Sequence, residues 1–191
     1  MTHQNELPIG LTERLADAPT PNVVMARPAR RGITIAIDPG ASGGFAICYP
    51  DGMIALYAMP EADTDRIDLI TSAQAQAAIE GVLIQAVMEQ VTGYVAPKKS
   101  EGDRFRQPGS AMFNFGEGFG FLRGAVLALG IPLRMVSAKQ WQKGLWIGTK
   151  EDRATRKRAL KAKAQEMFPA LKPTLKTCDA LLILDWANRC L

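Results

Sequence analysis

Histidine is almost missing from this chain, and its scarcity narrows the chemistry that the sequence can support. The only histidine among the 191 residues is His3, so catalytic triads and metal sites built on histidine are excluded. The three cysteines, Cys48, Cys178 and Cys190, show no Cys-x-x-Cys spacing. We therefore expect reduced thiols, no zinc site and a cytoplasmic location. Any acid–base or metal chemistry must depend on carboxylates, with help from Lys, Tyr or water.

Long apolar runs and a strong net charge are also lacking. No apolar segment is long enough to span a bilayer, and the first residues lack the layout of a secretory signal. We therefore expect no membrane partner. A net charge of +4 is mildly basic, which permits a polyanionic partner without requiring one. The 47% hydrophobic and 22% charged residues are ordinary for a globular protein, and a chain of this length fits one domain.

Proline content separates the first residues from the rest of the chain. Four prolines interrupt residues 1–31, which show little periodicity. We expect a flexible N-terminal extension over residues 1–31 and one folded domain over residues 32–191. Arginines just before residue 32 could touch a polyanion, and a solvated tail is the alternative.

Strand-like and helical patterns alternate through the folded part. Strands are expected over 33–37, 44–49, 53–59, 82–91 and 133–136. Helices are expected over 65–80, 116–130, 137–141, 150–168 and 178–189, with a long polar loop over 94–110. Tight turns make the first three strands antiparallel, whereas helical crossovers predict parallel strands later. The expected fold class is α/β, a mixed five-stranded sheet with three antiparallel and two parallel strands and helices on both faces.

Asp38 is the most informative residue, because it ends an apolar, β-branched segment and precedes a Pro-Gly turn. A charged group so close to a buried strand is unfavourable unless something compensates it. A metal ion or a phosphate-bearing ligand is the usual compensation. The alternative is a turn aspartate that caps Gly40 or Ala41.

Two further acids occupy suggestive positions. Glu89 lies near the end of the fourth expected strand, and Asp179 opens the last expected helix. Taken alone, Glu89 could face solvent at an edge, and Asp179 could be a helix cap. If the first and fourth strands are adjacent and parallel, Asp38 and Glu89 lie side by side at the carboxyl end of the sheet, where ligand sites form. Ligands that offer only oxygen favour Mg²⁺ or Mn²⁺ over zinc.

These segments together resemble a known family. Asp38-Pro-Gly-Ala-Ser-Gly-Gly, Glu89 and Asp179-Ala-Leu-Leu-Ile resemble, in this order, the RuvC-type Holliday junction resolvases of the ribonuclease-H-like nuclease superfamily. Residues 113–120 and 136–141 are similar to the phage and bacterial branch. The match in order extends over residues 32–187, which is more specific than any single motif. The resemblance implies a ribonuclease-H-like fold and a homodimeric, metal-dependent endodeoxyribonuclease that resolves four-way DNA junctions by paired nicking.

The resemblance also implies roles for particular residues. Asp38, Glu89 and Asp179 would be catalytic and would hold two Mg²⁺ or Mn²⁺ ions per active site. The family usually has a fourth acid or histidine three residues before Asp179, where this chain has Lys176. Another group or a water completes the metal shell there, or Lys176 itself contacts the scissile phosphate. A solvated loop residue is the alternative.

Cations and aromatic side chains supply candidate DNA contacts in the polar loop, the glycine-rich helix, the short helix and the basic helix. Clustered Lys and Arg suit phosphate contact, and aromatic rings can stack on unpaired bases. Solvated charged faces and core packing of the phenylalanines are the alternatives. The candidates are Lys98, Lys99, Arg104, Phe105, Arg106, Phe113, Phe115, Arg123, Lys139, Lys150, Arg153, Arg156 and Lys157.

The sequence also leaves other functions open. A non-catalytic junction-binding protein is suggested by Lys176 at the expected acid position. Another ribonuclease-H-like nuclease could act on RNA–DNA hybrids or flaps. The Asp-x-Gly-x-x-Gly-Gly turn at Asp38 also resembles the phosphate loop of actin-like and sugar-kinase ATPases. Those enzymes enclose ATP between two such domains, and this chain has room for one.

Overall fold

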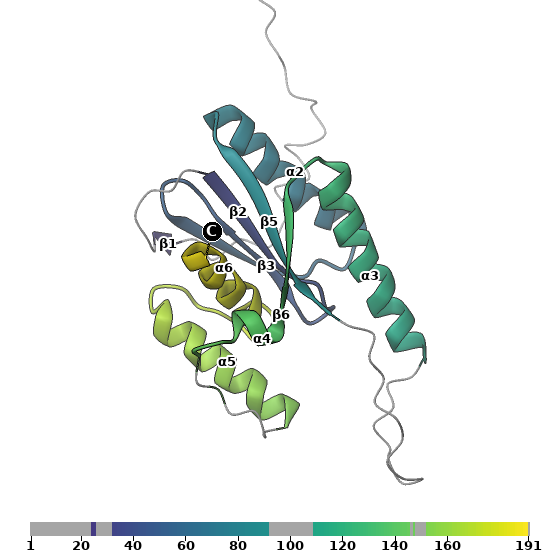
Figure 1. Cartoon of the computed structure of the whole chain (residues 1–191), viewed down its shortest axis with the longest axis vertical. Helices are drawn as coiled ribbons and strands as arrows, with labels where there is room; N and C mark the ends of the chain where they lie inside the picture. Colours follow the sequence, from purple (N-terminus) through teal and green to yellow (C-terminus); the bar gives the residue numbers. More distant parts are fainter. Residues whose placement is uncertain (1–23, 26–31, 92–108, 146, 148–151, 191) are drawn as a thin grey trace, which may run out of the picture.

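The computed structural model describes residues 24–25, 32–91, 109–145, 147 and 152–190, and the account that follows concerns these residues (Figure 1). The strands are β1 (Val24–Met25), β2 (Gly32–Asp38), β3 (Gly44–Cys48), β4 (Met53–Ala58), β5 (Leu83–Gln90) and β6 (Leu133–Ser137). The helices are α2 (Asp63–Glu80), α3 (Gly109–Ala128), α4 (Ala138–Trp141), α5 (Arg153–Met167) and α6 (Cys178–Cys190).

One mixed sheet with the strand order β1-β4-β3-β2-β5-β6 forms the centre of the molecule. Strands β4, β3 and β2 pair antiparallel, and β2, β5 and β6 pair parallel. The expected α/β fold class, with three antiparallel and two parallel strands in one mixed sheet and helices on both faces, is therefore confirmed. The two-residue strand β1 is an addition, because it pairs with β4 from within the segment expected to be a flexible extension. The other residues of 1–31 lie outside the described residues, so that boundary stays a prediction.

The two faces of the sheet carry separate hydrophobic cores. Side chains alternate across a strand, and on β2 the residues Ile33, Ile35 and Ile37 belong to the core under α2 and α3. Ala36 belongs to the opposite core, which contains residues of α5 and α6. Figure 1 shows the sheet between α2 and α3 on one side and α4, α5 and α6 on the other. By the same alternation, Asp38 shares its face with Ala36 and lies on the α5–α6 side.

Helices α3 and α5 begin at least three residues from the expected positions, and α2 and α4 begin within two residues of them. Helix α3 begins at Gly109 rather than near 116, because its apolar positions extend in steps of three and four through the glycine-rich segment. These positions are Met112, Phe115, Phe119, Leu122 and Val126. Helix α5 begins at Arg153 rather than at 150, with Asp152 as its N-cap. In the described part of the chain, no helix is long and apolar enough to cross a membrane.

Candidate active site

Neighbouring parallel strands bring Asp38 and Glu89 together. The register pairs Ala36 with Val87 and Ile37 with Met88, so Asp38 and Glu89, the next residues on β2 and β5, lie side by side. Both follow the alternation onto the face that α6 covers. The conditional expectation that the first and fourth predicted strands are adjacent and parallel is met.

The turn after Asp38 is tight enough to require glycine. The amide of Gly43 donates to the carbonyl oxygen of Gly40 at 2.8 Å, and the amide of Gly40 donates to Asp38 Oδ1 at 3.4 Å. A Cβ on Gly43 would lie 2.3 Å from the backbone oxygen of Asp38 and 2.6 Å from its Cγ, so no side chain fits there. Asp38 thus caps its own turn with one oxygen and keeps the other for the site.

Asp179 enters the site from the start of α6. The residue is 8% exposed, and its two oxygens have different partners. The Cys178 thiol donates to Oδ1 at 3.2 Å, and Lys157 Nζ donates to Oδ2 at 2.6 Å. Burial raises the pKa of the Cys178 thiol to about 12, with the negative charge of Asp179 adding to the effect. The thiol therefore stays protonated and remains a donor to Asp179.

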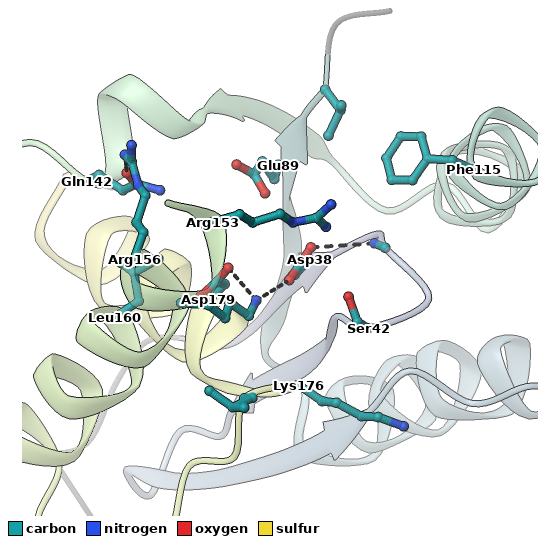
Figure 2. Close-up of a pocket in the computed structure, with 14 residues that line it drawn as sticks. Asp38, Ser42, Glu89, Phe115, Gln142, Arg153, Arg156, Leu160, Lys176 and Asp179 are labelled. Atoms are coloured by element: carbon teal, nitrogen blue, oxygen red, sulfur yellow. Dashed lines mark hydrogen bonds and ion pairs between the residues drawn. The ribbon is translucent and has the colours of Figure 1, made fainter. Parts of the chain in front are cut away.

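Lys157 of α5 links two of the three acids. Its Nζ lies 2.6 Å from Asp179 Oδ2 and 3.4 Å from Asp38 Oδ2, as the dashed lines in Figure 2 show. Burial works to lower the pKa of Lys157, but the carboxylates of Asp179 and Asp38 outweigh burial, and the pKa is raised. A persistent positive charge therefore lies between these two acids.

Burial makes Asp38 and Glu89 weaker acids than usual. It is the largest cause that raises the pKa of Asp38, and Lys157 opposes it. Burial, supported by the charge of Asp38, raises the pKa of Glu89 to about 7. The buried indole of Trp141 donates to Glu89 Oε1 at 3.2 Å and favours the charged form. Glu89 can therefore bind or release a proton near neutral pH.

The three acids line one pocket of about 530 Å³. Acids and cations both converge on this pocket. Arg153 and Arg156 come from α5 and line the pocket together with the acids, as Figure 2 shows. Arg156 also donates a hydrogen bond to the side chain of Gln142. An acidic floor with a cationic wall can hold a metal ion and a phosphate-bearing ligand together. The lining residues are Asp38, Gly40, Ser42, Glu89, Val91, Phe115, Gln142, Arg153, Arg156, Lys157, Leu160, Leu175, Lys176 and Asp179.

Lys176, at the position of the family's fourth acid, also lines this pocket. Its side chain is exposed, and its backbone amide donates to Thr174 Oγ1 at 3.2 Å. Figure 2 shows its amine directed away from Asp38 and Asp179. A phosphate contact by Lys176 stays a prediction.

The other candidate DNA contacts divide into three groups. Phe115 lines the pocket and stacks on Phe119, with ring centroids 6.4 Å apart. Phe113 is 70% exposed, and it lies on α3 outside the pocket lining, as do Arg123 on α3 and Lys139 on α4. Six candidates lie outside the described residues, namely Lys98, Lys99, Arg104, Phe105, Arg106 and Lys150.

The pairing of Lys157 with two of the acids was not predicted from the sequence. A signal for its position was present, because Lys157, Leu160 and Ala164 follow one another in steps of three and four along α5. Leu160 and Ala164 are buried, so the same stripe carries Lys157 toward the sheet. The sequence also gave no indication of Gln142 in the pocket lining or of the hydrogen bond from Trp141 to Glu89.

The residues of the pocket fit a divalent cation in chemical type. The three acids offer carboxylate oxygens, which Mg²⁺ and Mn²⁺ prefer, and Asp38 and Asp179 already share one cation, the ammonium of Lys157. In the described part of the chain, no three His, Cys, Asp or Glu side chains are arranged as a group that could hold a metal ion. Lys157 Nζ lies 3.4 Å from Asp38 Oδ2 and 2.6 Å from Asp179 Oδ2, the oxygens that such an ion would share.

No protein-family model matches the sequence, and no curated protein is significantly similar to it. Among solved structures, a Thermus thermophilus RuvC structure matches with 12% identity and a TM-score of 0.45, over 82% of this chain and 95% of that one. A structure of T. thermophilus RuvC in complex with Holliday junction substrate matches with 14% identity and a TM-score of 0.46, over 83% of this chain and 95% of that one. This chain is similar to RuvC structures.

Proposed function

We propose that this chain is a metal-dependent, structure-selective endodeoxyribonuclease that resolves four-way DNA junctions by paired nicking. The observation that carries the proposal is the convergence of Asp38, Glu89 and Asp179, from β2, β5 and α6, on one pocket with Arg153 and Arg156 beside them. The order of these acids along the chain is also the order of the motifs that resemble RuvC-type resolvases. A cytoplasmic location is part of the proposal.

Asp38, Glu89 and Asp179 would hold the Mg²⁺ or Mn²⁺ ions, two per site by the resemblance. Bound ions of this kind supply an activated water and stabilise the leaving oxygen of a phosphodiester. Arg153 and Arg156 lie where they can attract the phosphate backbone, and Phe115 offers a ring face to an unpaired base at an open junction. The chain's own contribution is thus to collect the ligands and to orient the DNA.

A homodimer belongs to the same proposal. A four-way junction has near two-fold symmetry, so two protomers related by a two-fold axis would present two sites to paired strands. A plasmid that extrudes a cruciform tests this arrangement. Paired nicks within one binding event give linear product directly, whereas independent single nicks accumulate nicked circles first.

The decisive experiment compares Asp38→Asn with wild type on a synthetic four-way junction in Mg²⁺ or Mn²⁺, with duplex and hybrid controls. The amide keeps an oxygen for the amide of Gly40 but is a poor ligand, so we expect nicking to fall by at least about 100-fold while junction binding persists. Asp51→Asn is the matched control, because Asp51 is exposed and lies in the turn between β3 and β4. Its Oδ1 accepts a hydrogen bond from the amide of Met53 at 2.8 Å, as Asp38 Oδ1 does from Gly40. Full nicking by Asp38→Asn contradicts the proposal.

One alternative has an observation in its favour. The ion pairs of Lys157 neutralise part of the acidic centre, as they would in a protein that binds junctions without cutting them. Tight junction binding with no cleavage in either metal would establish that alternative. Preferred cleavage of hybrids or flaps would instead assign a different ribonuclease-H-like nuclease.

A further inference from the structure

Lys157 differs from its neighbours on α5 in what its charged end contacts. Lys161 is exposed, and Lys163 pairs with Glu166 at 2.9 Å along the helix surface. The ammonium of Lys157 instead bridges Asp38 and Asp179. The Lys157 side chain is 25% exposed and each carboxylate side chain 12%. A charge-assisted contact that is partly shielded from water is stronger than a fully exposed ion pair.

Lys157 uses the oxygens that a metal ion would need. Its Nζ contacts Oδ2 of Asp38 and Oδ2 of Asp179, whereas the Oδ1 atoms are held by the amide of Gly40 and the thiol of Cys178. The Oδ2 atoms are therefore the ones turned toward a shared cation. A divalent ion and an ammonium repel each other at such short range, so the two cannot occupy this position together.

We propose that Lys157 is a built-in counter-cation that competes with a divalent metal ion for Asp38 and Asp179. This inference rests on the proposed function, since it assumes that these acids bind metal. Metal binding releases the ammonium into the pocket, where α5 also presents Arg153 and Arg156. Metal binding thus has two effects. It places a divalent cation between the acids, and it adds the charge of Lys157 to the part of the pocket where Arg153 and Arg156 would face a phosphate.

Two other roles for Lys157 make different predictions. If it only stabilises the fold, its removal lowers stability but leaves metal affinity unchanged. If it organises the acids for the metal, its removal weakens metal binding. Competition alone predicts that the metal binds more tightly when the ammonium is gone, because the ion no longer has to break two ion pairs.

The test is the affinity of the full chain for Mg²⁺ and Mn²⁺ without DNA, measured by titration calorimetry. Lys157→Met keeps the length of the side chain and removes its charge, and Lys161→Met is the matched control on the same helix. We expect Lys157→Met to lower Kd by roughly ten-fold, the equivalent of one charge-assisted hydrogen bond, while Lys161→Met leaves Kd unchanged. Equal or higher Kd values for Lys157→Met overturn the inference, and they leave the nuclease proposal standing wherever wild type nicks junctions. Lack of metal binding by wild type and variant overturns both.

A measurement on the wild-type chain keeps the inference testable if Lys157→Met does not fold. An amine-acylating reagent followed by mass spectrometry reports how accessible each lysine is. We expect Mg²⁺ to increase the labelling of Lys157 several-fold while that of Lys161 stays constant. Unchanged or reduced labelling of Lys157 at saturating Mg²⁺ overturns the inference.

Discussion

Glu89 keeps a proton over a range in which an exposed glutamate has lost it. The cause is its place on a central strand, where burial and the neighbouring Asp38 both disfavour the charged form and raise its pKa to about 7. In the unfolded chain the group returns to the ordinary glutamate pKa of 4.5. Between these values the folded protein binds more protons than the unfolded one, so its free energy of unfolding falls as pH rises.

We therefore expect Glu89→Gln to become more stable relative to wild type as pH increases from about 4.5 to about 7. Glutamine keeps the oxygen that accepts from Trp141 and has no proton to lose. Urea unfolding at several pH values with a chelator present measures the difference. Glu61→Gln, the same change at an exposed position, should leave the pH dependence of the free energy of unfolding unchanged. A stability difference independent of pH would show that Glu89 is not desolvated.

Gly43 has a role that its neighbour Gly40 does not share. A Cβ at Gly43 would overlap the backbone of Asp38, whereas one at Gly40 would lie 3.8 Å from Asp38 Oδ1, an ordinary contact. Gly43→Ala should lower the free energy of unfolding by about 1–3 kcal/mol, and it should reduce nicking because it moves Asp38. Gly40→Ala should cost less than about 1 kcal/mol. Denaturant unfolding and junction cleavage of both variants provide the comparison, and equal behaviour would contradict it.

Among the helices, α5 has the most direct influence on the site, because it supplies Lys157, Arg153 and Arg156. Its first turn is fixed by Asp152, whose Oδ1 accepts from the amides of Ala154 at 2.9 Å and Thr155 at 3.1 Å. The position of these cations therefore depends on the capping of the helix.

Asp152→Ala should lower the free energy of unfolding, because the amides of Ala154 and Thr155 lose the oxygen that caps them. Asp152→Ser should recover most of the loss, since a hydroxyl can accept the same bonds. Denaturant titrations of the two variants test this. The expectation fails if alanine and serine give the same stability as wild type.

Strands and helices of this chain differed in how well they could be predicted. The apolar runs of β2 and β5 indicated where these strands lie, and the neighbourhood of Asp38 and Glu89 followed on the condition that the two strands are adjacent and parallel. The basic helix has cations at Arg153, Arg156, Lys157 and Arg158, and composition does not say which of them turns inward. Tertiary packing of Leu160 and Ala164 decides that.

At the scale of the whole molecule, the order of elements and the mixed sheet could be read from turn lengths and helical crossovers. The balance of charge inside the pocket could not, because it depends on two helices, α5 and α6, that meet only after folding. Asp179 alone predicted an acid at a helix start. Its pairing with Lys157 required knowledge of how α5 packs on α6.

The net charge of +4 is too small to hold DNA by itself, so the distribution of cations matters more than their sum. Arg153 and Arg156 line the pocket, whereas Arg158, on the same helix, is exposed and outside the lining. If the pocket meets the phosphate backbone, each lining arginine adds to the counterions released on binding. The affinity for a junction should therefore fall as the salt concentration rises, with a slope to which each of these arginines contributes.

Junction binding, measured with a chelator present over a series of salt concentrations, should show a linear fall of log affinity with log salt. The double variant Arg153→Gln with Arg156→Gln should reduce that slope by about 2, one for each phosphate contact. Arg158→Gln is the control for charge alone and should leave the slope nearly unchanged. A flat salt dependence in wild type would place the DNA away from this pocket. Equal slopes for the double variant and wild type would show that the two arginines serve the acids rather than the nucleic acid.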